Sequence, residues 1–212
     1  MPAFGGKDFL LKMGNAVTGA VTFQDTGDTV TKTAHGLMNG DVVTFSVITT
    51  TTGIVINTDY FVVSSAANTF QVSALEGGSA IALTTNGTGT LDEGFAIVGG
   101  LRSTSLAINA EAIDVTHQGS AQWKTLLDGA GIKSAAISGS GVFEQDSRLE
   151  RLRTNIFAQT VTNFKIVEHS SGDFFSGAFK ITSFERSGDY NNEQSWSISL
   201  ESSGAVLYTA VA

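Results

Sequence analysis

The sequence contains no cysteine and only one proline among its 212 residues. Without cysteine, disulfide bonds, thiolate nucleophiles and thiolate metal sites are all excluded. No apolar run approaches the roughly 20 residues of a membrane-spanning helix, and the first residues lack the continuous apolar segment of a secretory leader. From these absences we expect a soluble protein that is made and kept in the cytosol.

Positive charge is also scarce. Lys and Arg together number 12 against 20 Asp and Glu, which gives a formal net charge of −8. Basic side chains that neutralise phosphates supply most of the affinity of proteins for nucleic acids, so tight binding to DNA or RNA is not expected. An acidic surface to which DNA does not adhere is compatible with this composition.

The residues that are abundant indicate a β-rich protein. Hydrophobic residues make up 42% of the chain and charged residues 15%, which is enough apolar material for a substantial core. Glycine and threonine are frequent beside valine, isoleucine and phenylalanine, a combination typical of short strands joined by turns. The sequence therefore predicts a mainly β fold.

One segment, Val21–Asp92, differs from the rest of the chain because it has a single lysine and no arginine. Short β-branched runs alternate there with turn sequences, and they recur about every ten residues, as in small barrels and sandwiches. The predicted strands are TVTKTA, DVVTFSVI, DYFVVS, TFQVSA and AIALTT. The segment thus predicts a small antiparallel barrel or sandwich.

The position of this segment suggests an insertion. Removing it would join Lys7–Met13 to Gly94–Gly99, and these two runs read as the arms of a simple hairpin. Insertions succeed at exposed loop tips whose ends lie close together. We predict a small all-β domain at residues 21–92, inserted into a discontinuous domain of residues 1–20 and 93–212.

Strand alternation marks Ser103–Thr116, Ile132–Phe143 and three later runs. In the last run, Ser195–Glu201, apolar residues face one way and Ser and Glu face the other. One apolar and one polar face is typical of an antiparallel sheet that is half exposed.

Asp146–Phe157 is the only strong helical pattern. Asp146 is placed to cap its N-terminus, and apolar residues recur on one face at helical spacing. The buried face is predicted to contain Leu149, Leu152 and Ile156.

No constellation of catalytic or metal-binding residues emerges from the sequence. His35, His117 and His169 stand singly, without an HExxH or a spaced histidine pair. Glu111 and Asp114 lie three residues apart on a predicted strand, where they would point to opposite faces rather than form an acid–base pair. We expect no enzymatic activity, no cofactor and no metal. The helical arginines are interpreted as a solvated or salt-bridged face: Arg148, Arg151 and Arg153.

Outside the insertion, several runs follow one another in a familiar order: GLRSTSLAINAEAIDVT, WKTLLDGAG, SAAISGSGVF before a short helix, and FKITSFERSGDYNNEQSWSISLESSG. This order resembles the major tail tube proteins of long-tailed phages, of the non-contractile type, and the tail protein of gene transfer agents. The likeness covers roughly Lys7–Gly14 and Gly94–Gly204.

The resemblance implies two packed antiparallel sheets with one flanking helix. It also implies a structural protein of the virion tail, assembled in the cytoplasm of the bacterial host. Such proteins form hexameric rings that stack into a hollow tube, through which double-stranded DNA passes without tight binding. The implied partners are copies of the same chain and other tail proteins, namely the tape measure, tail terminator and baseplate.

The insertion has a weaker likeness of its own. The runs AHGLMNGDVVTF, DYFVVSS and NTFQVS are similar to a small β-barrel module of phage structural and surface proteins, which implies a position on the outer surface of the tube. An alternative function is a surface module that binds carbohydrate or the host envelope. Exposed aromatic side chains would favour that alternative, although alternation predicts that most of Tyr60, Phe61 and Phe70 are buried.

The connection His117–Gly131 is too apolar for a free loop. Its apolar residues either fold back on their own core or dock on the next ring, and the resemblance favours docking. The predicted inter-ring contacts are Trp123, Leu126 and Leu127.

The resemblance also implies a face that lines the channel. The run Lys133–Glu144, KSAAISGSGVFE, alternates like a strand although half of it is Ser, Gly and Ala. Its small residues either face an open channel or mark a β-bulge in an ordinary sandwich, and both interpretations stay open. Carboxylates on a channel face would repel phosphate. The predicted lumen-facing residues are Glu111, Asp114, Ser138, Ser140 and Glu201.

Overall fold

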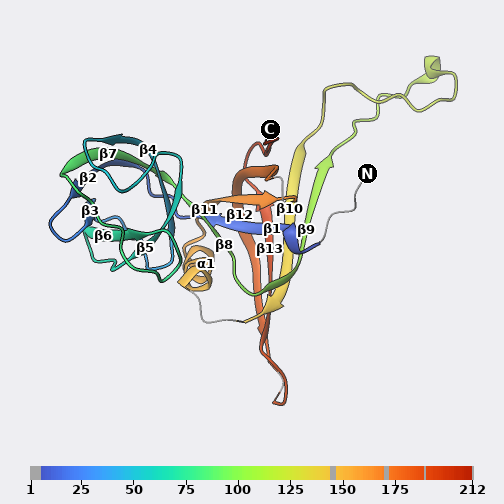
Figure 1. Ribbon diagram of the computed structural model, residues 1–212. Helices are drawn as coiled ribbons and strands as arrows, with labels where there is room; N and C mark the ends of the chain where they lie inside the picture. Colours follow the sequence, from blue (N-terminus) through green and yellow to red (C-terminus); the bar gives the residue numbers. More distant parts are fainter. Residues whose placement is uncertain (1–5, 144–146, 170–171, 189, 212) are drawn as a thin grey trace.

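A computed structural model describes residues 6–143, 147–169, 172–188 and 190–211 (Figure 1). These residues form an eight-stranded sheet, a separate closed barrel of six strands and one α-helix. Every strand pairing within the sheet and the barrel is antiparallel. The predicted mainly β fold with one helix and a small all-β barrel is confirmed.

The barrel lies at one side of the molecule and the large sheet at the other, with helix α1 between them (Figure 1). The barrel strands are β2 (Gly19–Gln24), β3 (Thr29–Thr31), β4 (Val42–Thr49), β5 (Asp59–Val63), β6 (Thr69–Ser73) and β7 (Gly87–Glu93). The sheet strands are β1 (Leu10–Gly14), β8 (Phe95–Ile97), β9 (Leu101–Ala110), β10 (Lys133–Val142), β11 (Val161–Val167), β12 (Phe174–Ser187), β13 (Ser195–Ser202) and β14 (Leu207–Thr209), and α1 is Ser147–Ala158.

The barrel closes in the order β2-β3-β6-β5-β4-β7 around its own apolar core. Phe23 and Phe45 meet edge to face there, with ring centroids 5.3 Å apart, and Phe70 is also fully buried. Alternate residues of short β-branched strands point inward, so a small barrel fills with aromatic and branched side chains. The barrel therefore has a core distinct from that of the sheet.

One predicted barrel strand is wrong. The run AIALTT at residues 80–85 is not a strand, and two barrel strands, β2 and β7, are absent from the predicted runs. Strand β7 has two glycines in its sequence. Gly87 lies against the backbone of Thr49, and Gly89 lies against the ring of Phe23, so a Cβ at either glycine would collide. Close packing requires glycine at these positions, and glycine is otherwise rare in strands, so the sequence pattern did not predict β7.

The large sheet has the order β8-β1-β11-β12-β13-β10-β9, with β14 paired to the start of β12. Its two end strands, β8 and β9, are separated by only Val98–Gly100, so the sheet curls on itself. Helix α1 packs across β12 and contributes Leu149 and Leu152 to the core inside this curl. The predicted buried face of the helix is confirmed for Leu149 and Leu152, and Ile156 is half-buried against the same core. The predicted cap, Asp146, lies outside the described residues.

The predicted hairpin that flanks the insertion is confirmed. Strands β1 and β8 pair antiparallel, with Lys12 opposite Ile97 and Gly14 opposite Phe95. Between them the chain leaves the sheet, completes the barrel from Gly19 to Glu93, and returns.

Strand β9 is shorter than predicted, because regular pairing with β10 stops at Ala110 instead of continuing to Thr116. Beyond it, residues 111–132 form a long projection that we call the arm (Figure 1). The arm is a narrow ribbon rather than a free loop. Val115 donates its N–H to Thr125, Leu127 donates its N–H to Ile113, and both bonds are 3.0 Å or shorter.

Candidate assembly surfaces

One face of the four strands β9, β10, β13 and β12 is rich in serine. Residues directly opposite each other in an antiparallel pair share a face, and the pairings bring serines together row after row. Hydroxyl groups of Ser105 and Ser138 lie 2.7 Å apart, as do those of Ser187 and Ser195. The serine face comprises Ser103, Ser105, Ser138, Ser140, Ser183, Ser187, Ser195, Ser197 and Ser199, with Glu185 opposite Ser197 and with Glu201 opposite Lys180 at one end.

Three of the predicted lumen residues, Ser138, Ser140 and Glu201, lie together on this exposed face. The opposite face of β13 carries Trp196, Ile198 and Leu200 into the core, as the alternation predicted. The pairing of β10 with β9 also shifts between Ser140 and Gly141, where Arg102 of β9 is the extra residue of a β-bulge. The serines of β10 thus lie on an exposed face, and its last glycine lies opposite a bulge in the neighbouring strand.

The other two predicted lumen residues, Glu111 and Asp114, lie in the arm and not on the serine face. Asp114 accepts a 2.9 Å hydrogen bond from the backbone N–H of Thr116, and the bonds from Thr116 lower the pKa of Asp114. Glu111 accepts a hydrogen bond from the N–H of Ile132 at the base of the arm. Alternation predicted the strand correctly up to Ala110 but did not reveal where it leaves the sheet.

The predicted contact residues of the arm are all exposed. Trp123 is 79% exposed, and Leu126 and Leu127 are each 49% exposed. At the tip, His117 caps a short 3-10 helix, Gln118–Ser120, by accepting the N–H of Gly119. The arm therefore presents apolar side chains on an ordered ribbon, away from the core of its own subunit.

The serine face is bounded by two unpaired strand edges. Within the described ranges, β9 pairs only with β10, and β12 has no partner beyond Lys180 on the side where β11 pairs with its first half. An edge strand with free N–H and C=O groups is a template for pairing with another chain. These two edges, β9 and Ile181–Ser187, are the strongest structural indication of self-association.

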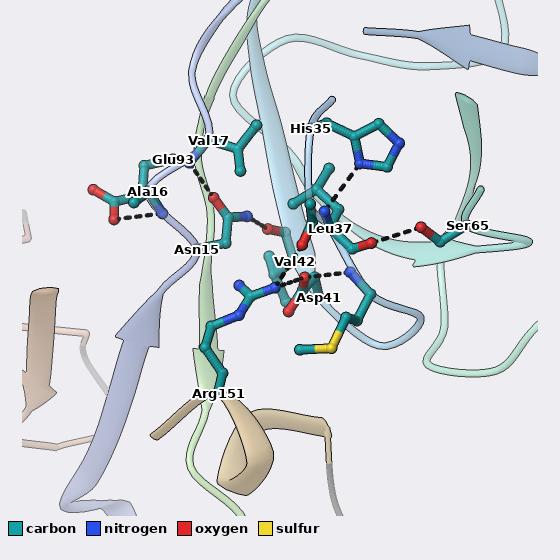
Figure 2. Close-up of polar contacts among 12 residues, drawn as sticks. Asn15, Ala16, Val17, His35, Leu37, Asp41, Val42, Ser65, Glu93 and Arg151 are labelled. Atoms are coloured by element: carbon teal, nitrogen blue, oxygen red, sulfur yellow. Dashed lines mark hydrogen bonds and ion pairs between the residues drawn. The ribbon is translucent and has the colours of Figure 1, made fainter. Parts of the chain in front are cut away.

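A buried ion pair joins the barrel to α1 (Figure 2). Arg151 donates to the Asp41 carboxylate at 2.6 Å and to the Gly36 carbonyl at 3.2 Å, and both charged side chains are largely buried. The same Asp41 oxygen accepts the N–H of Met38, which closes the turn before β4. Arg148 makes a second ion pair, with Glu76. The predicted salt-bridged interpretation of the helical arginines is confirmed for both.

The two chain segments that cross between sheet and barrel are also tied together (Figure 2). Asn15 donates its side-chain amide to the Val42 carbonyl at 2.6 Å. Glu93 accepts the Ala16 N–H at 3.0 Å and the Asn163 amide at 2.7 Å. Sequence reasoning missed this junction, because its partners lie up to 115 positions apart and no local pattern relates them.

The aromatic side chains of the barrel do not form a stacking surface. Phe23, Phe45, Tyr60 and Phe70 are buried, and Phe61 is half-buried. Buried aromatics pack the barrel, whereas sugar-binding surfaces expose an aromatic face.

Among the described residues, no group of three or more His, Asp or Glu side chains is arranged to hold a metal ion. Within the same ranges, no helix has the length and apolar character needed to cross a membrane.

The curled sheet, its hydroxyl-lined serine face and the two open edges that bound this face define a structural protein suited to edge-to-edge assembly. The family model described as phage tail tube protein matches residues 74–208, well over half of the chain. The chain therefore belongs to the phage tail tube protein family.

Two solved structures are similar to the chain. One is the tail of an empty gene transfer agent particle with C6 symmetry, at 39% identity and a TM-score of 0.52, covering 55% of this chain and 87% of that chain. The other is the virion of a native gene transfer agent particle, at the same identity and TM-score, covering 55% of this chain and 89% of that chain. No curated protein matches the sequence significantly.

Proposed function

We propose that this protein polymerises as stacked hexameric rings into the hollow tail tube of a virion, through which DNA is delivered. The observation that carries the proposal is the pair of open edges on the serine-faced sheet. Membership of the tail tube family supports the structural role, and the C6 symmetry of the similar gene transfer agent tail supports six subunits per ring. In this proposal the protein has no catalytic role.

The two open edges support a ring because they lie at the same level along the strand direction, which we call their height, and because their strand directions are compatible. Ile181 of β12 is level with Leu200, Ile137 and Leu106 on the three successive strands. The free half of β12 is therefore at the height of the first half of β9. Because each of the three intervening pairings is antiparallel, β12 and β9 run in opposite directions. Rotation about a ring axis keeps strand direction, so β9 of one copy meets β12 of the next as an antiparallel partner.

In the assembled ring the serine face lines the channel. Two pairs of serine hydroxyl groups are hydrogen-bonded to each other, and the carboxylates Glu185 and Glu201 outnumber the single Lys180 on this face. The face therefore attracts phosphate weakly, and DNA passes without tight binding. We propose Ser138, Ser140 and Glu201 as lumen-facing residues. The positions of Glu111 and Asp114 in the arm support a place near the contact between rings for these two carboxylates.

The arm is proposed to join successive rings. Its exposed Trp123, Leu126 and Leu127 are suited to a buried interface, and its hydrogen-bonded ribbon loses little conformational freedom on docking. A heterologous contact of this kind repeats along an axis and builds a filament.

We propose that the barrel, as an inserted domain of about residues 21–92, lies on the outer surface of the tube. Assembly in the host cytoplasm and contacts with tape measure, terminator and baseplate proteins complete the proposal. The alternative, a barrel that binds carbohydrate or the host envelope, has no support from the barrel's aromatic residues.

The test is negative-stain electron microscopy of the purified, concentrated protein. Hollow rings or tubes with regular axial striations and outer knobs are the expected result. A protein that stays monodisperse and monomeric at high concentration, also when mixed with preformed tube fragments, would contradict the proposal.

A further inference from the structure

Two apolar side chains beside the open edges are exposed although their neighbours are buried. Phe157, in the last turn of α1, is 88% exposed, and Ile108, near the end of β9, is 58% exposed. On the same helix Leu149 and Leu152 are fully buried, and on the same strand Leu106 packs against the core. Exposure thus begins where each element extends beyond the core of its own subunit.

The strand register gives both side chains a similar height on the molecule. Val161 begins β11 opposite Lys180 on β12, and Lys180 lies opposite Glu201 on β13. Glu201 lies opposite Ala136 on β10, which lies opposite Ala107 on β9. The start of β11, which directly follows the last turn of α1, is therefore level with the residue before the exposed isoleucine.

Both side chains also lie on the same side of the sheet. Along β9, Ile108 and Leu106 alternate with Ser105 and therefore face away from the serine face. Helix α1 packs on that side as well, since its buried residues join the core that contains Ile137 and Ile198.

The two side chains belong to elements at the two opposite edges of the serine face. Helix α1 packs on β12, and β9 is the last strand beyond β13 and β10 (Figure 1). They therefore approach each other between two copies of the chain when the edges join.

We propose that Ile108 of one subunit packs against Phe157 of the next subunit in the ring. This inference rests on the proposed ring and names an apolar contact on the outer side of each subunit joint. The occupant of the exposed Phe157 surface is β9 of a second copy. The matched height, the shared side of the sheet and the opposite strand directions of the two open edges support this choice.

Paired cysteines test the contact directly, because the natural chain has no cysteine. The double variant Phe157→Cys/Ile108→Cys is assembled, treated with a short thiol-specific crosslinker and analysed on a denaturing gel. The expected product is a ladder of covalent oligomers. A 1:1 mixture of the two single variants gives dimers only, and the matched pair Val55→Cys/Ile108→Cys, with its exposed barrel position, gives monomers.

The outcomes separate this inference from the proposed function. Tubes with a crosslinked ladder support both. Tubes visible by microscopy that yield only monomers after crosslinking overturn the Phe157–Ile108 contact and leave the tube function standing. A wild-type protein that forms no ring or tube overturns the proposed function and this contact with it.

A second measurement uses the critical concentration for assembly. Phe157→Ser is expected to raise it about tenfold or more, because the variant loses the burial of a large aromatic side chain at each joint. The monomer is expected to keep its thermal midpoint, since Phe157 is exposed there. Val55→Ser, which removes another exposed apolar side chain, is the control and should leave the critical concentration unchanged. Equal critical concentrations for Phe157→Ser and wild type would overturn the contact.

Discussion

Arg151 supplies one of two positive charges at the junction between barrel and helix, the other being that of Arg148. The Arg151 guanidinium and the Asp41 carboxylate are both largely withdrawn from water. Removing one partner of a buried pair leaves the other charge without compensation, which costs about 3–5 kcal/mol. Arg151→Met is therefore expected to lower the free energy of unfolding by about 3 kcal/mol, measured by urea denaturation with hydrogen exchange to localise the loss to residues 35–42.

The matched control is Arg153→Met on the same helix. Arg153 is exposed and its contact with Glu150 is 3.7 Å long, so its loss should change stability by less than about 0.5 kcal/mol. The double variant Asp41→Asn/Arg151→Met should recover part of the stability, because no buried charge is left alone. Equal effects of the two arginine substitutions would refute the assigned role of Arg151.

The burial of single residues was predictable where helical or strand periodicity determines which way the side chain points. Leu149 and Trp196 were expected in the core and are buried there, because helical and strand alternation determine which side they face. The partner of Arg151 was not predictable, since Asp41 lies in the barrel segment, 110 positions earlier in the chain. Phe157 fell on the predicted helix, but only the packing of α1 revealed that its side chain is exposed.

The arm is the element whose function is most directly testable. Trp123→Asp is expected to leave a folded subunit, because a side chain that is 79% exposed contributes little to the core. The same substitution places a charge in the proposed contact between rings, so polymerisation should be lost. Circular dichroism checks the fold, and sedimentation with microscopy checks assembly.

The control for the arm is Gln118→Asp, which adds the same charge to the exposed tip without removing an apolar side chain. It should assemble far better than Trp123→Asp. Full-length tubes formed by Trp123→Asp would refute the docking role of the arm.

Helices and strands were predictable where the pattern of apolar and polar side chains indicates them. They were not predictable where close packing of the backbone determines where a strand forms or ends. The alternation of β13 and the helical period of α1 gave both elements close to their observed ranges. Strand β7 was missed because Gly87 and Gly89 satisfy close contacts that are made only in the closed barrel. The end of β9 was missed because apolar and polar residues still intermix from Glu111 to Thr116 after regular pairing has stopped, although the alternation changes phase between Ala112 and Ile113.

At the scale of the whole molecule, we predict that the barrel can be deleted without unfolding the large sheet. Asn15 donates its backbone N–H to Gly94 at 3.2 Å, so a short Asn-Gly turn in place of residues 17–92 can connect β1 to β8. Arg151 would then lose its barrel partners Asp41 and Gly36 and face water, where an unpaired arginine costs little. The shortened chain is expected to fold and to form tubes of smaller outer diameter in negative stain. A shortened chain that folds but no longer assembles would mean that the barrel takes part in building the tube.

For the whole molecule, the sequence predicted the fold class and the order of the segments along the chain, but not the three-dimensional arrangement of the strands. The interrupted hairpin and the family resemblance were both visible in the order of segments. The curl of the sheet and the matched height of its open edges depend on pairings between strands far apart in the chain. The fit between the open edges of β9 and β12 follows from those pairings and not from the order of the segments.

The short distance between Asn15 and Gly94 has a practical consequence for engineering. The connection between β1 and β8 is therefore an insertion site for foreign domains. A domain whose own termini lie close together could replace the barrel there without lengthening the hairpin. If the proposed tube forms, each copy would carry one such domain at a regular spacing. Enzymes, antigens or fluorophores could then be arrayed along a self-assembling nanotube whose pitch is set by the protein.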